Sequence, residues 1–153
     1  MQHLFATTIL ILTLLGCGQR EEFNRSETIQ MNEHPSVQII DDANLEFVSV
    51  CLYVDNASVM AIGTKMNELD ERAHMHGYNW EAVLRFFLKA NHPQLMEGFG
   101  CDPEAGMFVA FYDRSDANRG KAKNLHDILI DLIKNEEQLY TLVQSHSDEI
   151  EWD

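Results

Sequence analysis

Two dense local patterns lie between residues 77 and 108, and they constrain the fold more than any other part of the chain. Residues 77–81 (GYNWE) open a segment whose apolar side chains recur at helical spacing, which predicts an amphipathic helix with Asn79 as its N-cap. The dipeptide His92-Pro93 ends this helix, because the residue before a proline avoids the helical region. Residues 102–108 (DPEAGMF) predict a turn into the apolar run 107–112, which we expect to be a strand buried on both faces.

The remaining patterns predict a mixed fold that begins with strands. Residues 37–40 and 45–54 are strand candidates, because they are rich in β-branched and aromatic side chains. Residues 59–62 are expected to return as the second arm of a hairpin, after which Thr64 caps a short helix. Two helices follow the apolar run, the first with a core stripe of Leu125, Ile128, Leu129, Leu132 and Ile133. This order predicts a single α+β domain, in which an antiparallel sheet of about four strands has helices packed on one side.

The N-terminus resembles a bacterial lipoprotein signal. Residues 4–15 are almost continuously apolar, but the run is too short to span a bilayer as a mature helix. Such a run followed by small residues is typical of a secretory signal peptide, with an ordinary anchor or a buried helix as the alternative. The sequence LLGC at residues 14–17 looks like a lipobox, which implies lipid attachment to Cys17. Because Gly18 rather than aspartate follows, the resemblance also implies an outer-membrane lipoprotein that faces the periplasm.

These features divide the chain into four parts. Residues 1–16 are the predicted lipoprotein signal peptide, and residues 17–35 are the lipidated cysteine and a flexible tether. The tether is predicted because its polar composition cannot bury enough apolar surface to offset chain entropy. Residues 36–147 are long enough for one domain with one core. The acidic tail 148–153 is expected to fray.

The net charge of −14 limits the choice of partners. Such a charge repels nucleic acid and anionic lipid, and it raises the rate at which basic partners approach. We therefore expect no nucleic-acid ligand and, if the charge has a function, a basic protein partner. Solubility alone is the simpler explanation of the charge.

Three histidines, His74, His76 and His92, are the most suggestive metal candidates, with Cys101 or Asp102 as a further ligand. Their spacing matches no recognised ligand pattern, so we interpret them as solvated loop residues and predict no metal and no cofactor. Asp102 and Glu104 are considered as an acid–base pair, but they flank a proline where aspartate commonly initiates a turn.

Cys51 and Cys101 remain once Cys17 is assigned to the lipobox. They lie in a chain whose predicted compartment permits disulfides, but sequence does not fix their separation, so a disulfide and two buried free thiols both stay open. No local signature marks either cysteine as a nucleophile. The sequence therefore predicts that the chain is not an enzyme.

The two opening motifs, in this order and at this spacing, resemble the immunity proteins of bacterial polymorphic-toxin systems, in particular family 51. The resemblance covers roughly residues 45–143. The positions it singles out as family-motif or partner-binding residues are Gly77, Tyr78, Trp80, Glu81, Asp102, Pro103, Glu104, Met107 and Phe108.

The resemblance implies an α+β protein that binds and neutralises one cognate toxin by occlusion. The motif residues are either structural or toxin-binding, and Tyr78 and Trp80 are the aromatic side chains suited to anchor an interface. The alternative is an envelope-associated structural or binding lipoprotein without a toxin partner.

Overall fold

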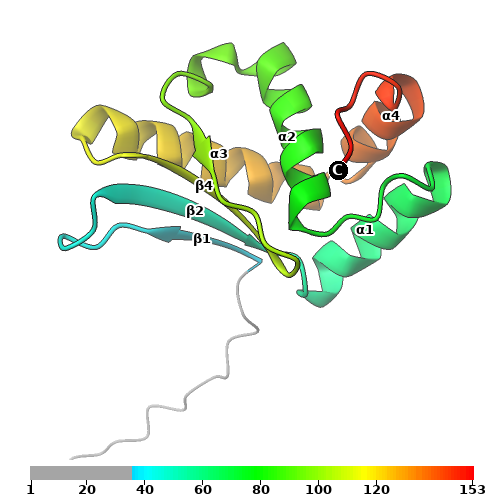
Figure 1. Ribbon diagram of the computed structural model, residues 1–153, viewed down its shortest axis with the longest axis horizontal. Helices are drawn as coiled ribbons and strands as arrows, with labels where there is room; N and C mark the ends of the chain where they lie inside the picture. The colour runs from blue at the N-terminus through cyan, green and yellow to red at the C-terminus, as the bar shows by residue number, and fades with distance from the viewer. Residues whose placement is uncertain (1–35) are drawn as a thin grey trace, which may run out of the picture. The chain divides into compact units, whose positions relative to one another are not determined.

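The protein is described from a computed structural model that defines residues 36–153. The predicted signal peptide, the lipid site at Cys17 and the tether lie outside the described residues. Residues 36–153 form an antiparallel sheet with a layer of helices (Figure 1), so the predicted α+β architecture is confirmed. Among the helices of this range, none is long and apolar enough to cross a membrane.

The sheet has four strands in the order β1-β2-β4-β3, and every neighbouring pair is antiparallel. They are β1 (Val37–Ile40), β2 (Phe47–Tyr53), β3 (Gly100–Cys101) and β4 (Met107–Asp113). The strands predicted over 37–40, 45–54 and 107–112 are confirmed. The short edge strand β3 was not predicted, because two residues carry no periodic signal.

The predicted strand over 59–62 is wrong, since these residues belong to helix α1 (Ala57–Leu69). Asn56 is the N-cap of this helix, and its side chain accepts a hydrogen bond from the backbone N–H of Ser58. Thr64 therefore lies inside α1 and does not cap it. Val59, Ile62 and Met66 are fully buried along one side of the helix, a spacing of three and four residues that a strand cannot provide.

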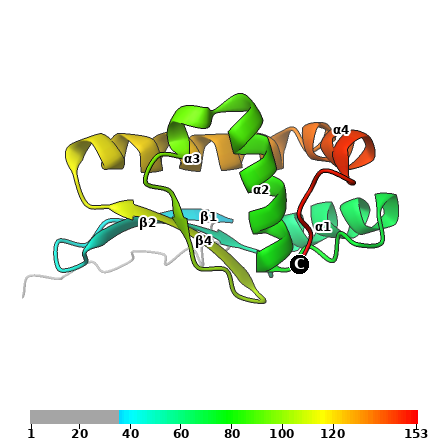
Figure 2. The same ribbon diagram turned by 45° about the horizontal axis from the view of Figure 1, so that its top comes forward.

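The other helices are α2 (Gly77–Asn91), α3 (Asp116–Lys134) and α4 (Glu137–His146), with a short 3-10 turn, η1 (Pro93–Leu95), after α2. Helix α3 packs along β1 and β2, α2 packs against β4, and α1 packs against α4. Figure 2 shows α3 and α2 on one side of the sheet, as predicted, with α1 beyond the end of the strands.

The two central strands alternate between a core face and an open face. Six side chains point into the core and are almost fully buried: Val48, Val50, Leu52, Phe108, Ala110 and Tyr112. Between them, Met107, Val109 and Phe111 are only half-buried. The prediction that residues 107–112 are buried on both faces is therefore wrong, because the described helices cover one face only.

The C-terminal residues 148–153 fold back onto the domain and do not fray as predicted. The Ile150 side chain is 5% exposed and belongs to the core cluster. Trp152 packs against that cluster, and its indole N–H donates to the carbonyl oxygen of Ser147 at 2.9 Å. Two apolar side chains dock this segment, together with the ion pair between Asp148 and Arg72.

Candidate functional site

The two sequence motifs meet in space, where the start of α2 lies against the turn that precedes β4. A Cβ atom added to Gly77 would lie 2.0 Å from the carbonyl oxygen of Glu104 and 2.2 Å from that of Met107. The backbone N–H of Gly77 donates to the carbonyl oxygen of Ala105 at 3.3 Å. Glycine is required here because two backbone segments approach more closely than any side chain permits.

The Glu104–Met107 turn is closed by its own backbone. The N–H of Glu104 donates to the carbonyl oxygen of Met107 at 2.8 Å, and the N–H of Met107 donates back at 3.3 Å. The carbonyl oxygen of Gly106 accepts from the N–H of Val54, which ties the turn to the end of β2. Asp102 precedes the turn, and its backbone N–H donates to the carbonyl oxygen of Val109 on β4. The backbone of this motif thus shapes the entry to β4, while the Asp102 and Glu104 side chains are exposed.

The N-cap of α2 is His76, not Asn79 as predicted. The Nδ1 atom of His76 accepts from the backbone N–H of Asn79 at 3.4 Å. Asn79 is fully buried, and its Oδ1 accepts from the N–H of Met75 at 3.0 Å. Met75 has φ = 53°, a left-handed backbone conformation. This conformation is strained for any residue that has a β-carbon. Asn79 therefore holds a strained connection into the motif, a role visible only once the helix start is known.

The two motif aromatics have opposite environments. The Trp80 side chain is 1% exposed and belongs to the core cluster, whereas the Tyr78 side chain is 44% exposed. Within residues 36–153, neither the indole N–H of Trp80 nor the side-chain NH₂ of Asn79 has a hydrogen-bond partner. Trp80 is thus a structural residue in this conformation, and Tyr78 is the motif aromatic that a partner can reach. Phe108 is also in the core, and Met107 is half-buried.

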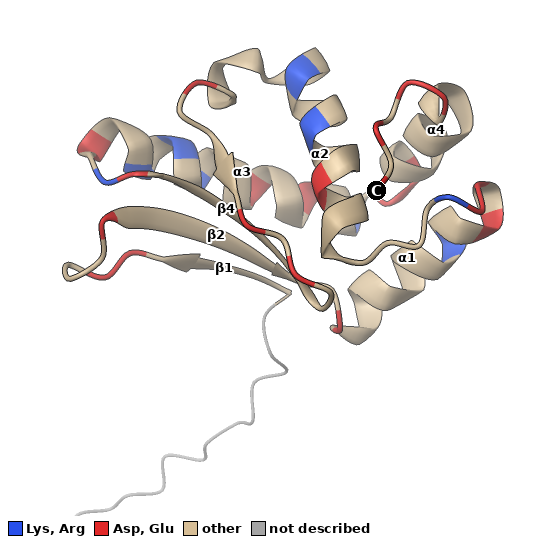
Figure 3. Ribbon diagram, viewed as in Figure 1, with Lys and Arg blue, Asp and Glu red and all other residues tan. Residues whose placement is uncertain are grey.

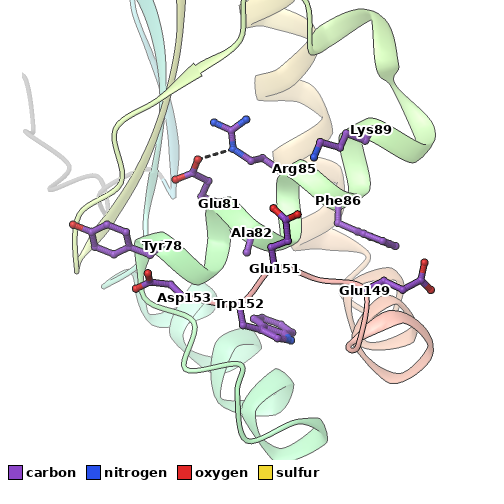
Figure 4. A pocket seen from close by; sticks show the side chains of 10 residues that line it. All are labelled: Tyr78, Glu81, Ala82, Arg85, Phe86, Lys89, Glu149, Glu151, Trp152 and Asp153. Atoms are coloured by element: carbon purple, nitrogen blue, oxygen red, sulfur yellow. Dashed lines mark hydrogen bonds and ion pairs between the residues drawn. The ribbon is translucent and has the colours of Figure 1, made fainter.

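Tyr78 and Glu81 lie on a shallow cleft of about 320 Å³ between α2 and the C-terminal segment. Figure 4 shows Arg85 and Lys89 on α2 and Glu151 of the C-terminal segment beside that helix, while the Trp152 ring points away from both basic side chains. The Glu81 carboxylate accepts from the guanidinium Nε of Arg85 at 2.6 Å. The cleft therefore presents mixed charges around an apolar floor, which suits contact with a protein more than catalysis.

The cysteines occupy opposite faces of the sheet and are both free thiols. Cys51 pairs in register with Val109 on the open face, while Cys101 pairs with Ala110 on the core face. Burial raises the pKa of the Cys101 thiol to about 12, so the thiol is protonated at neutral pH and a poor nucleophile. Burial also raises the pKa of Cys51. The sequence left open a disulfide or two free thiols, and in the structure Cys51 and Cys101 are two free thiols.

The three histidines do not converge. The rings of His74 and His76 stack with centroids 6.5 Å apart before α2, whereas the His92 ring contacts Phe87 at the far end of that helix. In the part of the chain that the structure describes, no cluster of three or more histidine, cysteine, aspartate or glutamate side chains could hold a metal ion.

A comparison with protein-family models matches residues 37–148 to Immunity protein 51. The match spans most of the chain and contains both motifs, so the protein belongs to the Immunity protein 51 family. Its role is that of an immunity protein against a toxin, and proteins of this kind are generally not enzymes. Comparisons with curated proteins and with solved structures find no match.

Proposed function

We propose that this immunity protein binds its cognate toxin in a stoichiometric complex and neutralises it by steric occlusion, without chemistry of its own. The observation that carries the proposal is the family match over residues 37–148. The interlocked motifs support it, because Gly77, Trp80 and the 104–107 turn build a rigid support for an exposed aromatic side chain, Tyr78. Rigid aromatic side chains are favoured anchors of protein interfaces.

The proposed toxin is basic. The chain carries a net charge of −14, and such a charge steers a basic partner into encounter while it repels nucleic acid. The association rate of the complex should therefore fall steeply as salt is added, while the dissociation rate changes little.

The proposed place of action is the periplasmic side of the outer membrane, with the domain attached through lipid at Cys17 and a tether up to residue 35. The lipobox-like LLGC sequence at residues 14–17 supports this presentation. A toxin met there attacks the cell wall or the membrane, or is intercepted on its way to the cytoplasm.

Growth of bacteria that express the full chain together with the toxin encoded by the neighbouring gene tests the proposal. The toxin is directed either to the periplasm or to the cytoplasm. Protection against the periplasmic form alone is expected, and protection against the cytoplasmic form alone would contradict periplasmic action. Lipidation is tested separately with a fatty-acid analogue, which should label the wild-type chain and not a Cys17→Ser variant. Equal labelling of both would refute attachment at Cys17.

A further inference from the structure

The face of the sheet opposite α3 and α2 carries several apolar side chains that the core does not use. This open face is defined by Ile40, Phe47, Tyr53, Val109 and Phe111, which are exposed or half-buried, and by Cys51 between them, whose side chain is only 3% exposed. None of the six belongs to the core cluster or to the partly buried residues packed against it. Phe47 is 39% exposed and Ile40 is 36% exposed. Figure 2 shows α3 and α2 on the other side of the sheet and α1 beyond the end of the strands.

The open face is continuous across the strands. Ser49 on β2 lies opposite both Ile40 on β1 and Phe111 on β4. The rings of Phe47 and Phe111 have centroids 4.9 Å apart. The Phe111 ring covers Gly100 on β3, where an added Cβ would meet the ring at 2.3 Å. Gly100 thus lets the aromatic side chain extend to the edge strand.

The polar groups near the centre do little to interrupt this surface. Burial raises the pKa of the Cys51 thiol, so the thiol is neutral at pH 7. The hydroxyl of Tyr53 donates to the Gln38 side chain on the neighbouring strand at 2.9 Å. A partner that covers the part of this face between Ser49 and Tyr53 therefore meets no charged side chain of β2 or β4 there.

The dimensions suit a protein interface. Strands β2 and β4 have seven residues each and β1 has four. With strands about 4.8 Å apart and a rise of about 3.4 Å per residue, the three form a plane of roughly 300 Å². An apolar patch of this size is comparable with the largest ones on monomeric proteins, which are often functional. It matches the apolar centre of an interface of about 800 Å² per partner, whose rim is polar.

The rim of the open face is acidic. The four strands contain no lysine or arginine. Asp113 lies opposite Phe47 on this face, and Asp102 continues the pairing of β3 through its hydrogen bond to Val109. Figure 3 shows acidic residues along the segment from β3 into β4 and along the β1–β2 loop, where Asp41 is paired with Arg114 and Arg119. Two copies of the chain would bring like charges together at this rim, whereas a basic partner would be attracted.

We infer that the open face is the surface on which the toxin docks, with an apolar segment of the toxin over Phe47, Ser49 and Phe111 and basic side chains facing Asp102 and Asp113. This inference rests on the proposed function and adds the binding surface to it. The exposed Tyr78, at the start of α2 beside the 104–107 turn that leads into β4, is then an anchor at the edge of this interface and not at its centre.

The test measures the affinity of the full-length chain, in detergent, for an inactivated form of the toxin encoded by the neighbouring gene. Ser49→Lys places a charge in the middle of the open face without touching the core. Gln144→Lys is the matched control, because Gln144 is an exposed residue of α4 in the helical layer. We expect Ser49→Lys to weaken binding by at least about 30-fold, the effect of an interface hot spot. Gln144→Lys should bind like the wild type.

A second variant, Ile40→Lys, alters the edge of the same face, so that the test does not depend on Ser49→Lys alone. Ile40→Lys should also weaken binding. Thermal melting shows whether each variant is folded. Asp102→Asn with Asp113→Asn should slow association several-fold and reduce its salt dependence.

If the wild type binds and the folded lysine variants bind equally well, the open face is not the docking surface, although the proposed function stands. A wild-type dimer that Ile40→Lys converts to a monomer would also overturn the inference, because the face would then serve self-association. If the wild type itself neither binds nor protects, the proposed function fails first.

Discussion

Replacement of Gly77 by alanine should change the stability of the fold in opposite directions, depending on whether helix propensity or close packing dominates. Helix propensity alone favours alanine over glycine by up to about 1 kcal/mol. The structure predicts the reverse, because the new Cβ would lie 2.0 Å and 2.2 Å from two backbone carbonyl oxygens. Ordinary contacts of this kind are about 3.5 Å long, so either α2 or the 104–107 turn must move by more than 1 Å. Overpacking against a backbone that cannot yield costs about 3 kcal/mol.

The control for this variant is Gly120→Ala in α3, where an added Cβ meets nothing within 4 Å. Alanine should stabilise that position by up to about 1 kcal/mol. Urea denaturation followed by circular dichroism measures the free energy of unfolding of both variants and the parent. We expect Gly77→Ala to lose about 3 kcal/mol of the free energy of unfolding, which corresponds to about 10 °C in melting temperature at about 3–4 °C per 1 kcal/mol for a domain of this size. A Gly77→Ala protein as stable as its parent would refute the close contact between the two motifs.

Three further outcomes concern neighbouring residues and acid stability. Trp80→Ala should destabilise the fold by about 3–5 kcal/mol, whereas Tyr78→Ala should change stability by less than about 0.5 kcal/mol, as measured by urea unfolding. Asn79→Ala should cost about 1–3 kcal/mol, because it removes the acceptor for a buried N–H, and unchanged stability would contradict that role. Hydrogen bonds from Arg72 and Ser147 lower the pKa of Asp70 in the folded state, so its stabilising effect is present above pH about 4 and is lost as the pH falls. Asp70→Asn should therefore flatten the decline of stability below pH 4, and an identical decline in both proteins would count against this ion pair.

The sheet and the long helices could be predicted because their side chains repeat with a clear period. Residues 45–54 alternate, and the core stripe of α3 recurs every three to four residues. The short apolar run 59–62 was misassigned, because four residues fit a strand and a helix turn equally well. Its helical state depends on the cap at Asn56 and on the longer spacing to Met66.

The contact between the two motifs could not be read from sequence. Gly77 and Glu104 are far apart in the chain, and nothing local in either motif states that their backbones touch. The N-cap of α2 was misplaced for a related reason, because Asn79 is a favoured cap by residue type but is used to support Met75. The open face could not be predicted either, because the sequence pattern of an apolar strand is the same whether or not a helix covers that face.

The central claim is that neutralisation occurs by binding and not by chemistry. A titration of the toxin encoded by the neighbouring gene with this chain tests it most directly, with the toxin held well above the dissociation constant. Toxin activity should fall linearly and reach zero at one equivalent of the chain. Loss of activity at a small fraction of one equivalent would show turnover, and no loss at a large excess would show that this toxin is not the partner; either result would contradict the account.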